Sequence, residues 1–181
     1  MSAGRRFPII ETDPSATVRL SLAERLGILH NVFKHQYFAV YRLIGERYGW
    51  QVANEIAGEV ASEASPMLAE AYRKKFSLPG TGAALVSQVI QAEFQGEGSD
   101  AAVLEESHDA AELDILCGFG DALQKPRFAE IAITEGLCER GCRLWAKDIA
   151  ATVDPELEAE RLTWMGDGAP RCRFRIERRQ P

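Results

Sequence analysis

The sequence predicts an α+β fold in which a helical N-terminal half packs on an antiparallel sheet formed by the C-terminal half. Before residue 95, apolar residues recur every three or four positions, which is typical of amphipathic helices. After residue 96, short segments alternate apolar and polar residues, which is typical of half-buried strands. One helical pattern lies between two pairs of such segments. The expected order in the C-terminal half is therefore β-β-α-β-β.

The 181 residues have the length of one compact domain. Residues 1–18 are rich in turn-forming residues and are expected to form an irregular arm. Residues 19–95 form the expected helical half and residues 96–181 the α+β half. The boundary lies at Gln95-Gly96-Glu97-Gly98-Ser99, where the helical repeat of apolar residues gives way to strand-like alternation.

The first helix is predicted to begin at Ser21, because Glu24 stands at capping-box spacing from it, and to end near residue 49. Its aromatic residues, Phe38 and Tyr41 among them, spread widely around the helix. One sheet does not easily cover so wide an apolar surface, so we expect a homodimer. The apolar stripe consists of Leu22, Leu26, Leu29, Phe33, Tyr37, Val40 and Ile44.

The remaining helices follow from breaks in the pattern. A second helix is expected from about Trp50. The pair Ser65-Pro66 predicts either a kink in it or the start of another helix that ends near Phe76. A short helix follows over residues 81–94, after the break at Leu78-Pro79-Gly80.

The C-terminal half is predicted to contain two strand pairs and one helix. Ser107-His108-Asp109 is the expected turn of the first pair, and a helical pattern from Pro126 to about Ala150 separates the pairs. The expected strands cover residues 101–106, 110–117, 157–165 and 171–178.

Composition excludes several classes of function. A net charge of −6 argues against a nucleic-acid partner, which favours a basic surface. The local arginines of the last strand are interpreted as its solvated face. No apolar segment has the length of a membrane span or of a signal peptide, so no membrane contact and a cytoplasmic location are expected. Cysteines in that compartment are thiols, catalysts or metal ligands rather than disulfides.

The four cysteines are predicted to converge on one layer. Period-two alternation points Cys172 to the core beside Phe174, and it points Cys117 to the core from another strand. Cys138 and Cys142 lie one turn apart on the helical stripe that faces the sheet. Two interpretations stay open: the thiols are packing residues that behave as small hydrophobes, or they form a site.

A metal site is one form of that second interpretation. Glu135 lies on the same stripe, and a carboxylate on a buried face is costly unless it is paired or bound to metal. Glu135-x-x-Cys138-x-x-x-Cys142 has ligand-like spacing, and thiolates suit zinc. With Cys172 the set would hold a zinc ion. The expected cofactor is therefore either none or zinc.

A catalytic cysteine is the other form. Cys117, Cys142 and Cys172 are the candidate nucleophiles or positioning residues, and His108 is the nearest base in the sequence. The chain contains no Gly-rich phosphate loop, no His-Glu-x-x-His pair and no Gly-x-Ser-x-Gly elbow.

Several sequence stretches of the C-terminal half, together with one of the helical half, form a pattern that is known from other proteins. The C-terminal half has a strand ending in Cys117, a helix carrying Cys142, and a turn leading to a strand that begins at Cys172. The stretches that complete the pattern are Pro155-Glu156-Leu157-Glu158-Ala159-Glu160-Arg161-Leu162, Gly166-Asp167 before Cys172-Arg173-Phe174-Arg175-Ile176, and Tyr48-Gly49-Trp50 followed by Ala53, Ile56 and Glu59. Over most of residues 20–178 the chain thereby resembles the L-2-amino-thiazoline-4-carboxylic acid hydrolase family.

The same C-terminal half also resembles vinyl-reductase-type small-molecule-binding domains, whose members can hold zinc with cysteine and acidic ligands. Thr163 stands where some of these relatives carry a further cysteine.

Two functions follow from these resemblances. The first is a hydrolase that opens a C–N bond in a small cyclic, thiazoline-carboxylate-like substrate. The alternative is a non-catalytic binding or sensor module that holds an apolar small molecule. The residues expected to line the substrate or ligand pocket are Tyr37, Phe119, Trp145 and Trp164.

Overall fold

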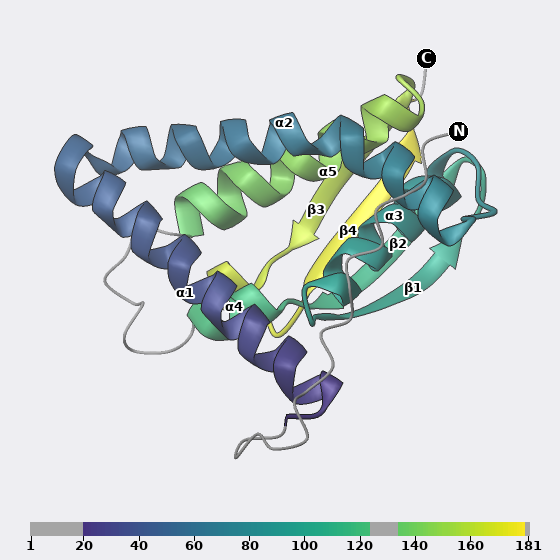
Figure 1. Ribbon diagram of the computed structural model, residues 1–181. Coiled ribbons are helices and arrows are strands. Elements are labelled where there is room, and N and C mark those ends of the chain that lie inside the picture. The colour runs from purple at the N-terminus through teal and green to yellow at the C-terminus, as the bar shows by residue number, and fades with distance from the viewer. Residues whose placement is uncertain (1–19, 124–133, 180–181) are drawn as a thin grey trace, which may run out of the picture.

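The computed structural model describes residues 20–123 and 134–179. It confirms the α+β prediction, because helices fill the N-terminal half and an antiparallel sheet of four strands fills the C-terminal half (Figure 1). The elements are α1 (Leu22–Tyr48), α2 (Trp50–Phe76), α3 (Ala83–Gly96), β1 (Asp100–Glu106), β2 (Ala110–Leu116), α4 (Gly118–Leu123), the π-helix η2 (Thr134–Cys142), α5 (Arg143–Val153), β3 (Leu157–Thr163), the 3-10 turn η3 (Met165–Asp167) and β4 (Cys172–Arg178).

The sheet has the strand order β1-β2-β4-β3, so the last strand lies in the middle. Antiparallel pairing sets Cys172 opposite Ile115 and Phe174 opposite Leu113. These side chains are all buried, while their neighbours along each strand point to the other face. One face of the sheet is therefore apolar and the other is polar.

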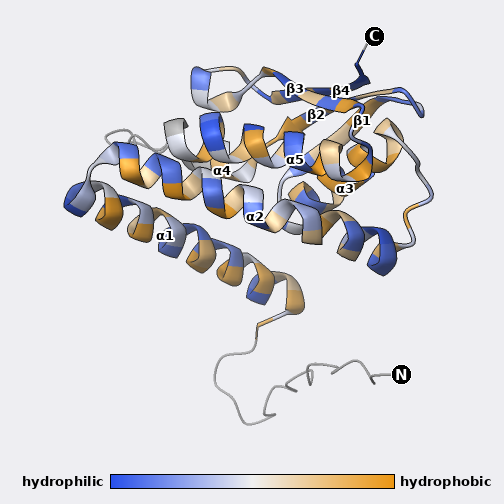
Figure 2. Cartoon of the chain, turned by 90° about the horizontal axis from the view of Figure 1, so that it is seen from above, coloured by the Kyte–Doolittle hydropathy of each residue, from blue (hydrophilic) through white to orange (hydrophobic). Residues whose placement is uncertain are grey.

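The apolar face is covered by layers of helices. Helices α3 and α5 contact the strands directly, and α2 lies on α5. Helix α1 contacts α2 and is the outermost layer (Figure 2). Helices α1 and α2 meet at the turn between them and then diverge (Figure 1).

The polar face carries the arginines of the last strand. Arg173 and Arg175 lie 3.5 and 3.2 Å from carboxylate oxygens of Glu112 on β2. Arg171 pairs with Asp114 on the same strand. These half-exposed ion pairs contribute little stability each. They confirm that the arginine cluster is the solvated face of a strand.

Two helix predictions are resolved in the N-terminal half. The capping box is present, because the Ser21 hydroxyl accepts from the Glu24 amide and the Glu24 carboxylate accepts from the Ser21 amide. Residues 50–76 form one helix with Pro66 inside it, so no new helix begins at Ser65. The Ser65 hydroxyl donates instead to the Ala61 carbonyl, at 2.9 Å.

The helix expected from Pro126 to about Ala150 is confirmed as helical from Thr134 onward, but it is not one regular α-helix. The first part of that range lies outside the described residues. From Thr134 the chain forms a π-helical segment and then α5. A methyl group on Gly136 would come within 2.6 Å of the Tyr41 ring. The close approach of η2 to Tyr41 of α1 therefore requires a residue without a side chain at this position.

Within the described ranges, no helix is both long enough and apolar enough to cross a lipid bilayer.

The buried face of β2 gives the first test. Replacing Ile115, which is fully buried, with Ala should lower the free energy of unfolding by about 2–5 kcal/mol, because the cavity left behind cannot collapse fully. The same deletion at Leu104, which is 54% exposed on β1, should change it by less than about 0.5 kcal/mol. Urea unfolding measures both. Equal effects would contradict the assignment of faces.

Candidate functional site

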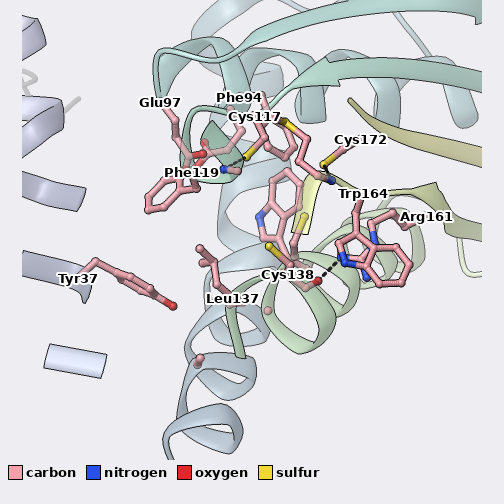
Figure 3. A pocket seen from close by; sticks show the side chains of 18 of the residues that line it. Tyr37, Phe94, Glu97, Cys117, Phe119, Leu137, Cys138, Arg161, Trp164 and Cys172 are labelled. Carbon is pink, nitrogen blue, oxygen red and sulfur yellow. Dashed lines mark hydrogen bonds between the residues drawn. The ribbon is translucent and has the colours of Figure 1, made fainter. Parts of the chain in front are cut away.

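A cavity of about 280 Å³ lies between the helical layers and the sheet (Figure 3). The four aromatic residues predicted to line a pocket, Tyr37, Phe119, Trp145 and Trp164, all border it. They come from α1, α4, α5 and the segment after β3. Residues distant in the sequence thus meet around one space, whose wall is mainly apolar.

Phe119 organises the α1 side of the cavity. Its ring packs edge-on against Phe33, Tyr37 and Phe38, with ring centroids 6.2, 6.0 and 5.9 Å away. It is presented by α4, a short helix that sequence patterns did not predict. Glycine is a poor helix former, and Phe119 stands between Gly118 and Gly120.

All four cysteines border the same cavity, as free thiols. The Cys117 sulfur accepts from the Gly120 amide at 3.4 Å, and the Cys172 sulfur accepts from the Met165 amide at 3.3 Å. The helical pair Cys138 and Cys142 faces them from η2.

Burial makes these thiols weak acids. It raises the pKa of Cys117 to about 11 and that of Cys138 to about 12. Burial likewise raises the pKa of Cys142, strongly, and that of Cys172. Because of these raised pKa values the thiols are protonated near neutral pH. They are then unreactive, because only the thiolate acts as a nucleophile or as a metal ligand.

His108 does not join the thiols. It lies in the turn between β1 and β2, where its Nδ1 is 3.2 Å from the Thr81 hydroxyl and its Nε2 is 3.3 Å from an Arg178 nitrogen. It does not border this cavity. The predicted pairing of His108 with a catalytic cysteine therefore has no counterpart in the described geometry, because the hairpin carries the histidine to another part of the molecule.

The zinc prediction also lacks a ligand cluster. Among the described residues, no group of three or more His, Cys, Asp or Glu side chains is arranged to hold a metal ion. Glu135 lies in η2, but its side chain is outside what the structure describes. Cys138, Cys142 and Cys172 border the cavity without forming such a group.

Arg161 is a site residue that the sequence analysis missed. It follows Leu157 and Ala159 on the inward face of β3, and its side chain is 2% exposed. Its guanidinium donates to the Cys138 carbonyl and, at 2.6 Å, to the Glu139 carboxylate, and it lies 4.3 Å from the Trp164 ring centroid. The signal was present: strict alternation puts Arg161 inward and Leu162 outward.

A second cavity of about 270 Å³ adjoins the first, and Phe33, Glu93, Glu97 and Phe119 border both. Burial raises the pKa of Glu97 to about 7, and the negative charge of Glu93 adds to this shift while Lys34 opposes it. The Tyr72 hydroxyl donates to the Glu93 carboxylate. The junction of the two cavities is thus a polar point in an apolar wall.

No protein-family model matches the sequence, and a search of the curated proteins finds no significant match. The fold is similar to the crystal structure of the phenol-responsive sensory domain of the transcription activator PoxR with phenol. The TM-score is 0.58, the identity is 14%, and the match covers 80% of this chain and 74% of that domain. The two therefore share a fold. The comparison does not support the resemblance to the thiazoline hydrolase family.

Glu97 gives a test of the cavity wall. Its folded pKa of about 7 exceeds the value of 4.5 of an ordinary glutamate, so between these values the folded protein holds a proton that the unfolded chain releases. The contribution of Glu97 to stability therefore falls as pH rises from 4.5 to 7 and is constant above that. Glu97→Gln should remove this pH-dependent contribution to stability and raise the melting temperature at pH 8. Replacing Glu105, exposed on β1, with Gln serves as the control. Melting curves between pH 5 and 8 that coincide for Glu97→Gln and the parent protein would contradict the assignment.

Proposed function

We propose that this chain is a small-molecule-binding module of the sensory type. It holds a largely apolar ring compound in the cavity between α1, α2 and the sheet, and it releases that compound unchanged. The observation that supports this most strongly is the cavity itself, which is bordered by aromatic rings and protonated thiols. The shared fold with a phenol-responsive sensory domain agrees with it.

The cavity has the size and chemistry for one substituted ring. An apolar protein cavity of about 150 Å³ stays dry and takes up benzene, and this cavity measures about 280 Å³. Phe94 packs edge-on against Trp145 at 5.6 Å on one wall, and Phe119 provides aromatic edges on another. Such rings favour the edge-on or offset packing of a further aromatic ring.

The described thiols and His108 do not form the catalytic set that was expected for the hydrolase alternative. Opening a cyclic C–N bond requires an activated nucleophile and an acid that protonates the leaving nitrogen. The raised pKa values of Cys117 and Cys138 keep these thiols neutral, and His108 lies away from them. The thiols act instead as small, polarisable parts of an apolar wall.

Filling the cavity tests the proposal. Toluene and phenol should quench the fluorescence of Trp145 or Trp164, which border the cavity. Ala61 also borders it, on α2, and Ala61→Phe should weaken binding of both compounds by more than about tenfold, because the added ring occupies the site. The matched variant Ala102→Phe changes an exposed position on β1 and should bind as the parent does. If neither compound binds, or if Ala61→Phe binds both normally, the proposal is wrong.

We also propose that the apolar outer surface of α1 is covered by a second copy of this chain. Its N-terminal turns extend beyond the contact with α2 (Figure 2). Apolar side chains along the helix, most of them in its N-terminal half, are open to solvent. Contiguous apolar surface of this kind marks association sites in soluble proteins. The exposed residues are Leu22, Leu26, Ile28, Leu29, Val32, Val40 and Leu43.

Light scattering at micromolar concentration should give the mass of a dimer. Replacing Leu26 and Leu29 together with Glu should give a folded monomer, because two carboxylates would have to be buried in the interface. Leu104→Glu, on the exposed surface of β1, should leave the dimer intact. A parent protein of monomeric mass would contradict this proposal.

A further inference from the structure

Arg161 is buried in the cavity wall with an unused hydrogen-bond donor. Its side chain is 2% exposed. One terminal nitrogen donates to the Cys138 carbonyl, and the other donates to Glu139. The third guanidinium nitrogen, Nε, is buried and has no hydrogen-bond partner among residues 20–123 and 134–179. Buried donors are almost always paired, and leaving one unpaired is costly, so this atom calls for an explanation.

The position of Nε is constrained. Trp164 covers one face of the guanidinium, with its ring centroid 4.3 Å from Cζ, and the two terminal nitrogens are tied to η2. Figure 3 shows Arg161 and Trp164 together on one side of the cavity, away from Tyr37. Arg161 borders this space, and none of the residues that the structure describes pairs with Nε, so a molecule in the cavity is the acceptor that we consider.

The charge around Arg161 is already balanced. Glu139 lies 2.6 Å from Nη2, and Arg143, the other partner of Glu139, is half-exposed to solvent. The thiols that face the guanidinium are neutral, because their pKa values are raised by burial. The other side of the cavity carries two carboxyl groups, those of Glu93 and Glu97, and the positive charge of Lys34 acts on Glu97. An anionic ligand would therefore lose its hydration without gaining a free counter-charge.

We infer that Arg161 anchors the ligand by donating from Nε to an uncharged oxygen acceptor. The ligand class is then a small aromatic compound with a ketone, ether or hydroxyl oxygen, rather than a plain hydrocarbon or a carboxylate. This inference rests on the proposed function, because it specifies which ring compound the cavity selects.

Three compounds of similar shape test it: acetophenone, isopropylbenzene and benzoate. The variant Arg161→Met/Glu139→Gln removes the donor without leaving the Glu139 carboxylate unpaired. It should weaken acetophenone binding by about tenfold, the effect of losing one hydrogen bond to a charged donor, and change isopropylbenzene binding by less than about twofold. Arg173→Met, on the solvent face of β4, is the matched control and should change neither.

A second variant tests the charge argument. Glu139→Gln keeps Arg161 but removes its counter-charge, so benzoate should bind at least about fivefold more tightly while acetophenone is unaffected. Calorimetry gives the affinities, and thermal unfolding confirms that each variant is folded.

Each outcome is decisive. Equal weakening of acetophenone and isopropylbenzene by Arg161→Met/Glu139→Gln would show that Arg161 shapes the cavity without anchoring a ligand. Benzoate binding the parent protein more tightly than acetophenone would overturn the choice of an uncharged acceptor. If isopropylbenzene binds but Arg161→Met/Glu139→Gln does not selectively weaken acetophenone binding, only this inference is wrong. If none of the three compounds binds, the proposed function falls with it.

Discussion

The register of the central strand is the constraint on which the site depends. Antiparallel pairing sets Cys172 of β4 opposite Ile115 of β2, and it sets Phe174 opposite Arg161 of β3. The apolar face of the sheet therefore changes along its length, from fully buried aliphatic residues to a thiol and a guanidinium. A one-residue slip would turn all of these side chains to solvent. The cavity forms where this end of the sheet meets η2, α4 and the diverging α1.

Much of the fold followed from periodicity. The strand pairs and the first helix were predicted because burial of one face imposes a repeat of two or of about 3.6 residues. The capping box at Ser21 located the start of α1. The same reasoning led to the four cysteines that border the cavity. The four aromatic lining residues were expected from the binding alternative, and the roles of all eight residues stay predictions.

The remaining features depend on tertiary contacts. Helix α4 is too short to show a period, and η2 departs from the α-helical repeat at a glycine packed against Tyr41. Arg161 was not predicted as a site residue, although its inward place in the alternation of β3 indicated burial. Glu97 stands in a Gly-rich turn, and residues of α1, α2 and α4 border the cavity beside it.

We propose that the cavity binds a ring compound without transforming it. The most direct measurement is mass spectrometry after prolonged incubation with 2-amino-thiazoline-4-carboxylate, with acetophenone as the bound reference. We expect the thiazoline ring to be recovered intact and acetophenone to be retained by the protein unchanged. Formation of a ring-opened product that has gained one water, over many turnovers and only when the cavity is not filled at Ala61, would contradict it.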